Sequence, residues 1–174
     1  MKGSNPTEFD FEIDRLTNSI QNVVTGDSFD TVVSLITVNE QRQVKKTEWL
    51  FDWKKELNDS RKSVYKLTIA ENINIIQGLI SIEDKNDHIF MHLIESAKYN
   101  KGKQKIYYGV PGNLVAFACN LSCEKGYGGV VSFFAKTKLI DHYKDSLGAT
   151  VLFGNHMIID ELNAKKLIER YFKF

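Results

Sequence analysis

The hydrophobic and polar positions of the chain follow two periods, that of a strand and that of a helix. Residues 64–69 alternate apolar and polar side chains, and residues 73–82 form a second strand in which Gly78 marks a bulge. Residues 89–95 are too apolar for one face of the strand to be exposed to solvent, so this strand should be central and covered on both sides. The predicted strands are residues 29–38, 64–69, 73–82, 89–95, 130–134, 151–153 and 157–159.

Four other stretches have apolar residues at helical spacing. In one of them the apolar positions are Leu114, Phe117, Ala118 and Leu121. Thr47 is of an N-cap type, so a helix should begin there. The predicted helices are residues 47–58, 114–126, 137–148 and 162–172. Residues 9–25 fit either a strand or a helix that ends near Gly26.

The order of these elements predicts a mixed α/β fold of the α+β kind. It consists of a central twisted, mixed, mostly antiparallel sheet flanked by helices. The chain has 174 residues, 43% of them hydrophobic and 26% charged, which suffices for one globular core. Two prolines and the absence of repeats indicate no linker. We therefore expect residues 1–174 to form a single domain, of which residues 1–45 are the least defined part.

Charge and composition exclude several classes of partner. The net charge is +1, and no basic field is present to drive nucleic-acid binding. The first residues lack an apolar signal region and no run reaches membrane-spanning length, so we expect a cytoplasmic protein with no membrane partner. Cys119 and Cys123 lie four apart without further ligands at zinc spacing, which indicates core-facing thiols and no metal.

The stretch 107–118 carries the clearest functional signal. It reads as the end of a strand, a glycine turn, and a helix whose first turn has no bulky side chain. Such a turn presents backbone N–H groups at the positive end of the helix dipole, where a phosphate binds. Gly109 and Gly112 allow close approach, and Pro111 suits a first-turn position although it removes one donor. A cluster of basic residues precedes the turn and is either a solvated loop or a rim that attracts anions. It comprises Lys98, Lys101, Lys103 and Lys105.

The glycine turn, together with residues 143–149 (YKDSLGA), resembles the GNAT superfamily of acyl-CoA-dependent N-acyltransferases. The resemblance covers roughly residues 60 to 174. Stretches 92–97 (HLIESA) and 100–102 (NKG) also resemble a subgroup of small bacterial GNAT-like proteins. The chain departs from the family pattern at several positions. Ile106 stands where the family has Gln or Arg, and Pro111 where it has its second Gly or Ala. Lys136 stands where the family often has Asn, and Ala149 where it has its final Phe.

The resemblance implies acetyl-CoA (coenzyme A) as cosubstrate, bound through its pyrophosphate at the glycine turn, with an amine as acceptor. Tyr143 would then donate a proton to the departing thiolate, and Glu95 would act as the base. His92 should lie on the opposite face of the strand from Glu95, because the two are three positions apart. The expected cofactor-binding residues are Ile94, Ser96, Lys101, Lys103, Gly109, Val110, Gly112, Asn113 and Leu114.

Three functions stay open at this point. The first is an N-acetyltransferase that acts on an amine of a small molecule or a protein. The second is a non-catalytic acyl-CoA-binding module, which the residues at Ile106 and Pro111 favour. The third is a protein-interaction domain that has kept the fold, and a homodimer is an open assembly for any of them.

Overall fold

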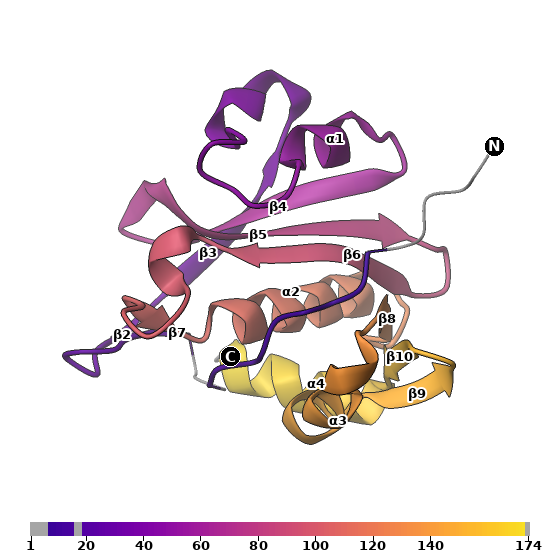
Figure 1. The fold of residues 1–174 in the computed structure, drawn as a ribbon. Coiled ribbons are helices and arrows are strands. Elements are labelled where there is room, and N and C mark those ends of the chain that lie inside the picture. The colour runs from indigo at the N-terminus through magenta and orange to yellow at the C-terminus, as the bar shows by residue number, and fades with distance from the viewer. Residues whose placement is uncertain (1–6, 16–18, 173–174) are drawn as a thin grey trace.

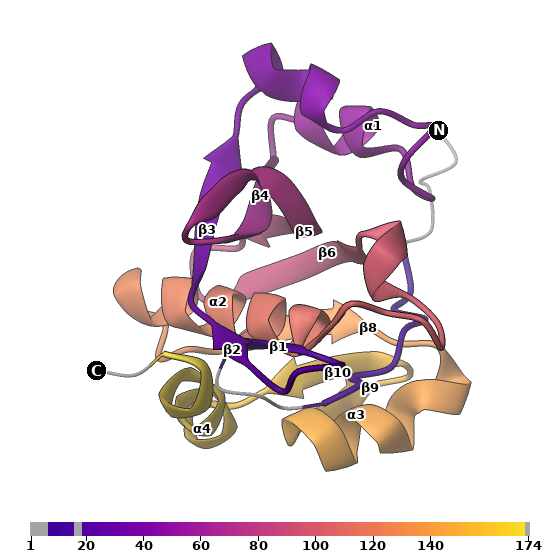
Figure 2. The same ribbon diagram turned by 90° about the vertical axis from the view of Figure 1, so that its left-hand side faces the viewer.

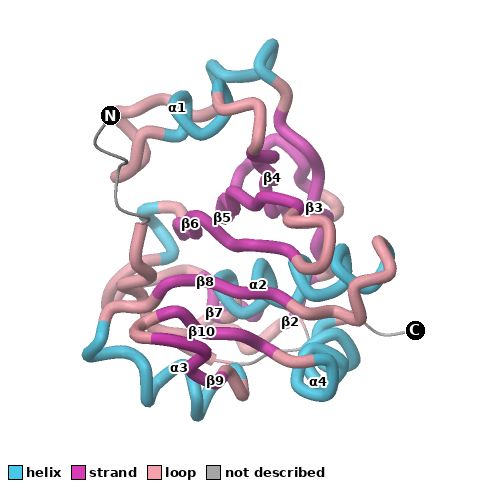
Figure 3. The backbone as a smooth tube through the Cα atoms, turned by 90° about the vertical axis from the view of Figure 1, so that its right-hand side faces the viewer, coloured by secondary structure: helices cyan, strands magenta, loops and turns pink. Residues whose placement is uncertain are grey.

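The computed structural model describes residues 7–15 and 19–172, and its centre is a seven-stranded sheet (Figure 1). The strand order is β3-β4-β5-β6-β8-β10-β9, and every neighbouring pair is antiparallel except β6 with β8. The strands are β3 (Thr31–Ile36), β4 (Lys62–Ile69), β5 (Asn72–Asp84), β6 (Ile89–Ser96), β8 (Val131–Phe134), β9 (Thr150–Phe153) and β10 (His156–Ile159). Figure 3 shows the strands following one another down the molecule from β4 to β9.

Helices cover both faces of this sheet (Figure 2). The short helix α1 (Trp53–Asn58) lies against β4, while α2 (Val110–Glu124) lies on the other face against β5 and β6, with α4 (Glu161–Tyr171) beside it. The chain also forms α3 (Ile140–Leu147) and the 3-10 turns η1 (Val38–Gln43), η2 (Lys98–Asn100) and η3 (Thr137–Leu139). None of the helices within residues 7–15 and 19–172 is long and apolar enough to cross a membrane.

The sheet separates two apolar clusters. Successive residues of β5 show the alternation, since Leu79 packs in the cluster of Trp53 and Leu93, while Ile80 packs in the cluster of Leu114. This arrangement confirms the predicted mixed α/β fold with a twisted, mostly antiparallel sheet flanked by helices.

One predicted strand is divided between two sheets. The prediction treated residues 29–38 as continuous, but the chain passes at Asp30 from a small sheet into the large one. The small sheet has the order β2-β1-β7 and consists of β1 (Ile20–Asn22), β2 (Ser28–Phe29) and β7 (Tyr107–Tyr108). It joins the first strands of the chain to the residues that precede the glycine turn.

One helical prediction is wrong, and one open choice is resolved. The helix expected from Thr47 begins only at Trp53, where the carboxylate of Asp52 accepts a hydrogen bond from the Lys55 N–H. The N–H groups of Leu50 and Phe51 point instead to a carboxylate on β6. Of the two alternatives for residues 9–25, the described part contains the strand β1, which pairs with β2, and no helix.

β6 and β8 diverge after a short contact. They pair only at Ile89 with Val131 and at Phe90 with Ser132, so the rest of β6 has no β8 partner. Residues 7–15 run along the β8 side of this opening: the Phe9 N–H donates to the Phe134 carbonyl, and the Lys136 N–H donates to the Phe9 carbonyl. Figure 1 shows this first segment crossing in front of α2.

Gly78 lies beside the bulge that the sequence predicts in β5, since Leu67 pairs with Gly78 and Thr68 with Ile76. A Cβ at Gly78 would lie 2.6 Å from Cγ1 of Val110 on α2. We therefore expect Gly78→Ala to lower the free energy of unfolding by about 1–3 kcal/mol through overpacking. Urea unfolding would measure this cost in the wild type and in Val110→Ala, where the methyl group that meets the new Cβ is gone. An equal cost in both backgrounds would contradict the explanation.

Candidate functional site

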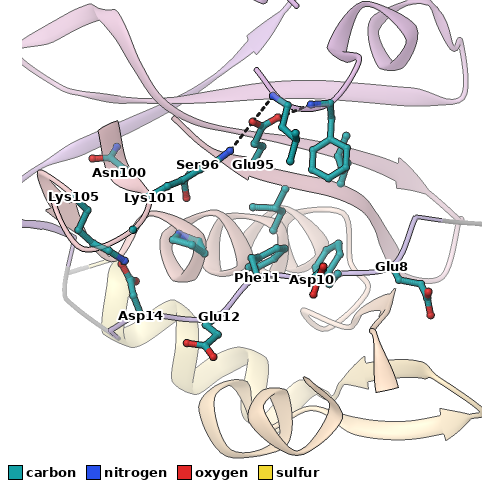
Figure 4. Close-up of a pocket in the computed structure, with 17 residues that line it drawn as sticks. Glu8, Asp10, Phe11, Glu12, Asp14, Glu95, Ser96, Asn100, Lys101 and Lys105 are labelled. Atoms are coloured by element: carbon teal, nitrogen blue, oxygen red, sulfur yellow. Dashed lines mark hydrogen bonds and ion pairs between the residues drawn. The ribbon is translucent and has the colours of Figure 1, made fainter. Parts of the chain in front are cut away.

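A cavity of about 560 Å³ occupies the opening between β6 and residues 7–15. Residues 93–96 of β6 form one wall, and residues 8–12 together with Asp14 form another (Figure 4). Leu50 and Phe51 line a third side, and Pro111 of α2 closes the end at the glycine turn. The divergence of the two central strands therefore creates a cleft that ends at the N-terminus of α2.

The glycine turn has the geometry that the sequence predicts. Gly109 is the N-cap of α2 with φ +92°, a left-handed conformation that glycine adopts without strain. Its N–H donates a hydrogen bond of 3.2 Å to the Asp14 carboxylate, whose other oxygen lies 2.9 Å from the Lys105 ammonium. The first-turn N–H groups of Val110 and Gly112 have no preceding helical carbonyl to bond. A carboxylate at this place shows that the turn accommodates an anion.

Tyr143 lies beneath residues 7–15. It is fully buried, and its hydroxyl donates a 2.5 Å hydrogen bond to the Phe11 carbonyl. Burial raises the pKa of Tyr143, so the hydroxyl keeps its proton at neutral pH. Tyr143 does not itself line the cavity but lies against Phe11, which does, and its protonated hydroxyl is bonded to the Phe11 carbonyl.

Glu95 is buried, and four donors surround it. Its carboxylate accepts hydrogen bonds from the N–H groups of Leu50 and Phe51 and from the Trp53 indole, and it forms a 2.8 Å ion pair with Lys101. Burial alone would raise the pKa of Glu95, but the ammonium and the three N–H donors outweigh it and hold the pKa below its ordinary value. Through these hydrogen bonds the carboxylate links the segment before α1 to β6. Its role as a base stays a prediction.

The expectation that His92 and Glu95 lie on opposite faces of the strand is wrong. Ile82 pairs with Met91 and Ser81 with Leu93, so His92 is an extra residue that the pairing skips. Because of this bulge, the side chains of His92 and Glu95 lie on the same face of the strand. The His92 ring hydrogen-bonds to Glu83 and has Glu56 as a charged neighbour, on the side of the sheet where Glu95 bonds to Trp53.

The other predicted cofactor-binding residues fall into three groups. Ile94, Ser96 and Lys101 line the cavity. Val110 and Leu114 direct their side chains into the core, and Gly112 and Asn113 are buried in the first turn. Val110 and Gly112 would reach a ligand through their N–H groups, whereas the Asn113 N–H donates to the Gly109 carbonyl and Leu114 lies past the first turn. Lys103 is exposed and does not line the cavity, whereas Lys105 reaches the turn.

The sequence reasoning missed the contribution of residues 8–14. Acidic residues alternate there with Phe9, Phe11 and Ile13, and this period-two pattern of a strand is the signal that could have found it. It also assigned no role to His142, whose Nε2 accepts a 2.8 Å hydrogen bond from the Ile13 N–H. Within the described part of the chain, no group of three or more His, Cys, Asp or Glu side chains is arranged to hold a metal ion.

Comparison with solved structures identifies the fold. The chain is similar to the crystal structure of AtaTR bound with AcCoA, with a TM-score of 0.55 and 14% identity, covering 79% of this chain and 98% of that one. It is also similar to mutant forms of the spermidine/spermine N-acetyltransferase SpeG from Vibrio cholerae, with a TM-score of 0.54 and 11% identity, covering 79% and 97%. A third match is the ribosomal-protein-S18-alanine N-acetyltransferase from Escherichia coli, with a TM-score of 0.50 and 13% identity, covering 74% and 90%.

These matches show that the chain has the GNAT fold, as its glycine turn and residues 143–149 predict. No family model and no curated protein matches the sequence. The resemblance to a small bacterial subgroup therefore stays a prediction.

Proposed function

We propose that the chain binds acetyl-CoA in the cleft between β6 and β8 and transfers the acetyl group to an amine of a small molecule or a protein. The observation that carries this proposal is the opening of the sheet directly onto the N-terminus of α2, with Tyr143 beneath Phe11, which lines the opening. Fold neighbours support it, since one is bound with AcCoA and others are N-acetyltransferases.

The residues at the turn fit the anionic part of coenzyme A. The Gly109 N–H and the Lys105 ammonium already hold a carboxylate, and a phosphate oxygen makes the same kind of contact. The backbone of residues 94–96 would hold the arm of the cofactor, because this part of β6 has no β8 partner. When bound, the cofactor supplies an acyl thioester, whose C–S bond breaks as the amine forms a C–N bond.

The residues of the chain then act on two protons. The acceptor amine must lose a proton, and we assign its removal to Glu95, directly or through water. The departing thiolate must gain a proton, and we assign its supply to Tyr143. Burial raises the pKa of Tyr143, so at neutral pH the hydroxyl carries the proton that the thiolate would receive. The acceptor would enter past Leu50 and Phe51, which line the cavity opposite residues 8–12.

Replacing Tyr143 by phenylalanine should lower kcat about 100-fold, in the range of a lost general acid, while the affinity for acetyl-CoA does not fall. Thiol release from acetyl-CoA would be followed with a panel of amines that includes spermidine and peptides with N-terminal alanine. Tyr127→Phe is the matched control, because its hydroxyl bonds to Asp84, which does not line the cavity, whereas the Tyr143 hydroxyl bonds to Phe11, which does. Unchanged turnover in Tyr143→Phe would exclude the general-acid role.

The partners expected from composition stay predictions. One fold neighbour, the AtaT–AtaR complex, is bound to DNA. We keep the expectation of no nucleic-acid partner, because the net charge of this chain is only +1. A cytoplasmic location, the absence of a metal and a homodimer are likewise expectations.

A further inference from the structure

Residues 9–14 contact the groups that the proposed acyl-CoA site would use. At one end Phe9 bonds to the β8 side of the opening. In the middle the Phe11 carbonyl accepts a hydrogen bond from the Tyr143 hydroxyl, and at the far end the Asp14 carboxylate accepts one from the Gly109 N–H. Figure 4 shows Phe11 and Asp14 at the cleft, with Lys105 beside Asp14. One short segment thus engages both the proton donor and the phosphate turn.

The contact at the turn excludes a bound phosphate. The Asp14 carboxylate accepts a 3.2 Å hydrogen bond from the Gly109 N–H at the start of α2 and forms an ion pair with Lys105. A pyrophosphate at the same place would lie against a carboxylate of like charge in a partly buried site, where repulsion is poorly screened. Asp14 and the cofactor phosphates therefore compete for the same groups.

The contact at Tyr143 has the same consequence for the chemistry. The Tyr143 hydroxyl can donate one hydrogen bond, and the Phe11 carbonyl accepts that bond at 2.5 Å. Protonation of a thiolate requires that this hydrogen bond be broken. Release of residues 11–14 would free the Tyr143 hydroxyl and the Gly109 N–H together.

The two ends of the segment are held differently. Phe9 is buried, stacks on Phe133 with ring centroids 4.8 Å apart, and makes both backbone hydrogen bonds to the β8 side. Phe11 is only partly buried, and the Ile13 N–H bonds to a histidine side chain rather than to a strand, while the Ile13 side chain is buried in the core. Phe9 therefore has strand-like backbone hydrogen bonds that residues 11–14 lack, and release of these residues must withdraw Ile13 from the core.

We propose that residues 11–14 are an internal competitor of acyl-CoA, a strap that closes the phosphate turn and Tyr143 until the cofactor displaces it. This inference rests on the proposed function. A closed strap lowers the apparent affinity for coenzyme A by the fraction of molecules in which the site is open, so loosening the strap should strengthen binding.

Isothermal titration with free CoA tests this in the full chain. Asp14→Asn keeps the shape of the side chain but removes the charge that opposes the phosphates. Glu12→Gln removes one negative charge from the same segment, and within the described residues no hydrogen bond or ion pair involves the Glu12 side chain, so it measures the general effect of charge. We expect the Kd of CoA to fall at least tenfold in Asp14→Asn and about threefold or less in Glu12→Gln.

Amide hydrogen exchange followed residue by residue by NMR gives a second readout. CoA should speed exchange at Ile13, whose N–H loses His142, while Phe9 stays protected by Phe134. Equal CoA affinity in Asp14→Asn and Glu12→Gln, with Ile13 still protected in the complex, would overturn the strap and leave the binding site intact. Absence of CoA binding in all three proteins would overturn the strap and the proposed function together.

Discussion

Replacing Gly109 by glutamate should weaken CoA binding by about 100-fold or more, since like charges brought together at a binding site cost several kcal/mol. The substitution places a carboxylate at the N-terminus of α2, where the phosphates would bind to the backbone. It also adds a Cβ at φ +92°, a conformation that L residues adopt at a cost. Titration calorimetry with CoA measures the affinity, and circular dichroism confirms that the variant is folded.

Gly109→Asn separates the two effects. Asparagine tolerates the left-handed conformation better than other residues and carries no charge, so we expect it to keep most of the affinity. If Gly109→Glu folds and binds CoA as the wild type does, the cofactor does not use this turn.

Replacing Glu95 by alanine should lower the free energy of unfolding by about 3–5 kcal/mol, because each donor left without an acceptor costs about 1–3 kcal/mol. The change leaves the Leu50 and Phe51 N–H groups and the Trp53 indole without an acceptor, and Lys101 without its counter-charge. Urea unfolding measures the loss. Glu71→Ala is the control, because Glu71 is exposed in the turn between β4 and β5 and should change stability by less than about 0.5 kcal/mol.

The contribution of Glu95 should also depend on pH. Its pKa in the folded protein lies below the ordinary value of 4.5, so the stabilisation is fully present above pH 4.5 and is lost as the pH falls through the folded pKa. The stability difference between the wild type and Glu95→Gln should therefore shrink as the solution is acidified below pH 4.5. A difference that is constant from pH 7 down to acid unfolding would show that the charge of Glu95 does not stabilise the fold.

The parts of the fold that follow from local pattern were predictable. The alternation in residues 64–69, the apolar run at 89–95 and the helical spacing from Leu114 each correspond to an element of the structure. The turn at Gly109 was predictable as well, because a left-handed N-cap requires glycine for a local reason.

The features that depend on distant contacts were not predictable. The segment before α1 has a helical pattern, but its N–H groups bond to Glu95, which lies more than forty positions along the chain. The bulge at His92 arises from its pairing with β5 and reverses which side chains share a face. The position of Asp14 at Gly109 depends on a hydrogen bond across 95 positions of sequence. Local periodicity contains none of this information.

Isothermal titration of CoA into the wild type and into Asp14→Asn tests the central claim most directly. The cleft between β6 and β8 is proposed to be an acyl-CoA site whose phosphate turn Asp14 occupies. We expect saturable one-to-one binding in Asp14→Asn, with weaker binding in the wild type. No heat of binding and no thermal stabilisation by CoA in either protein would contradict the claim, and would leave the chain as a GNAT-fold domain that acts through protein interactions.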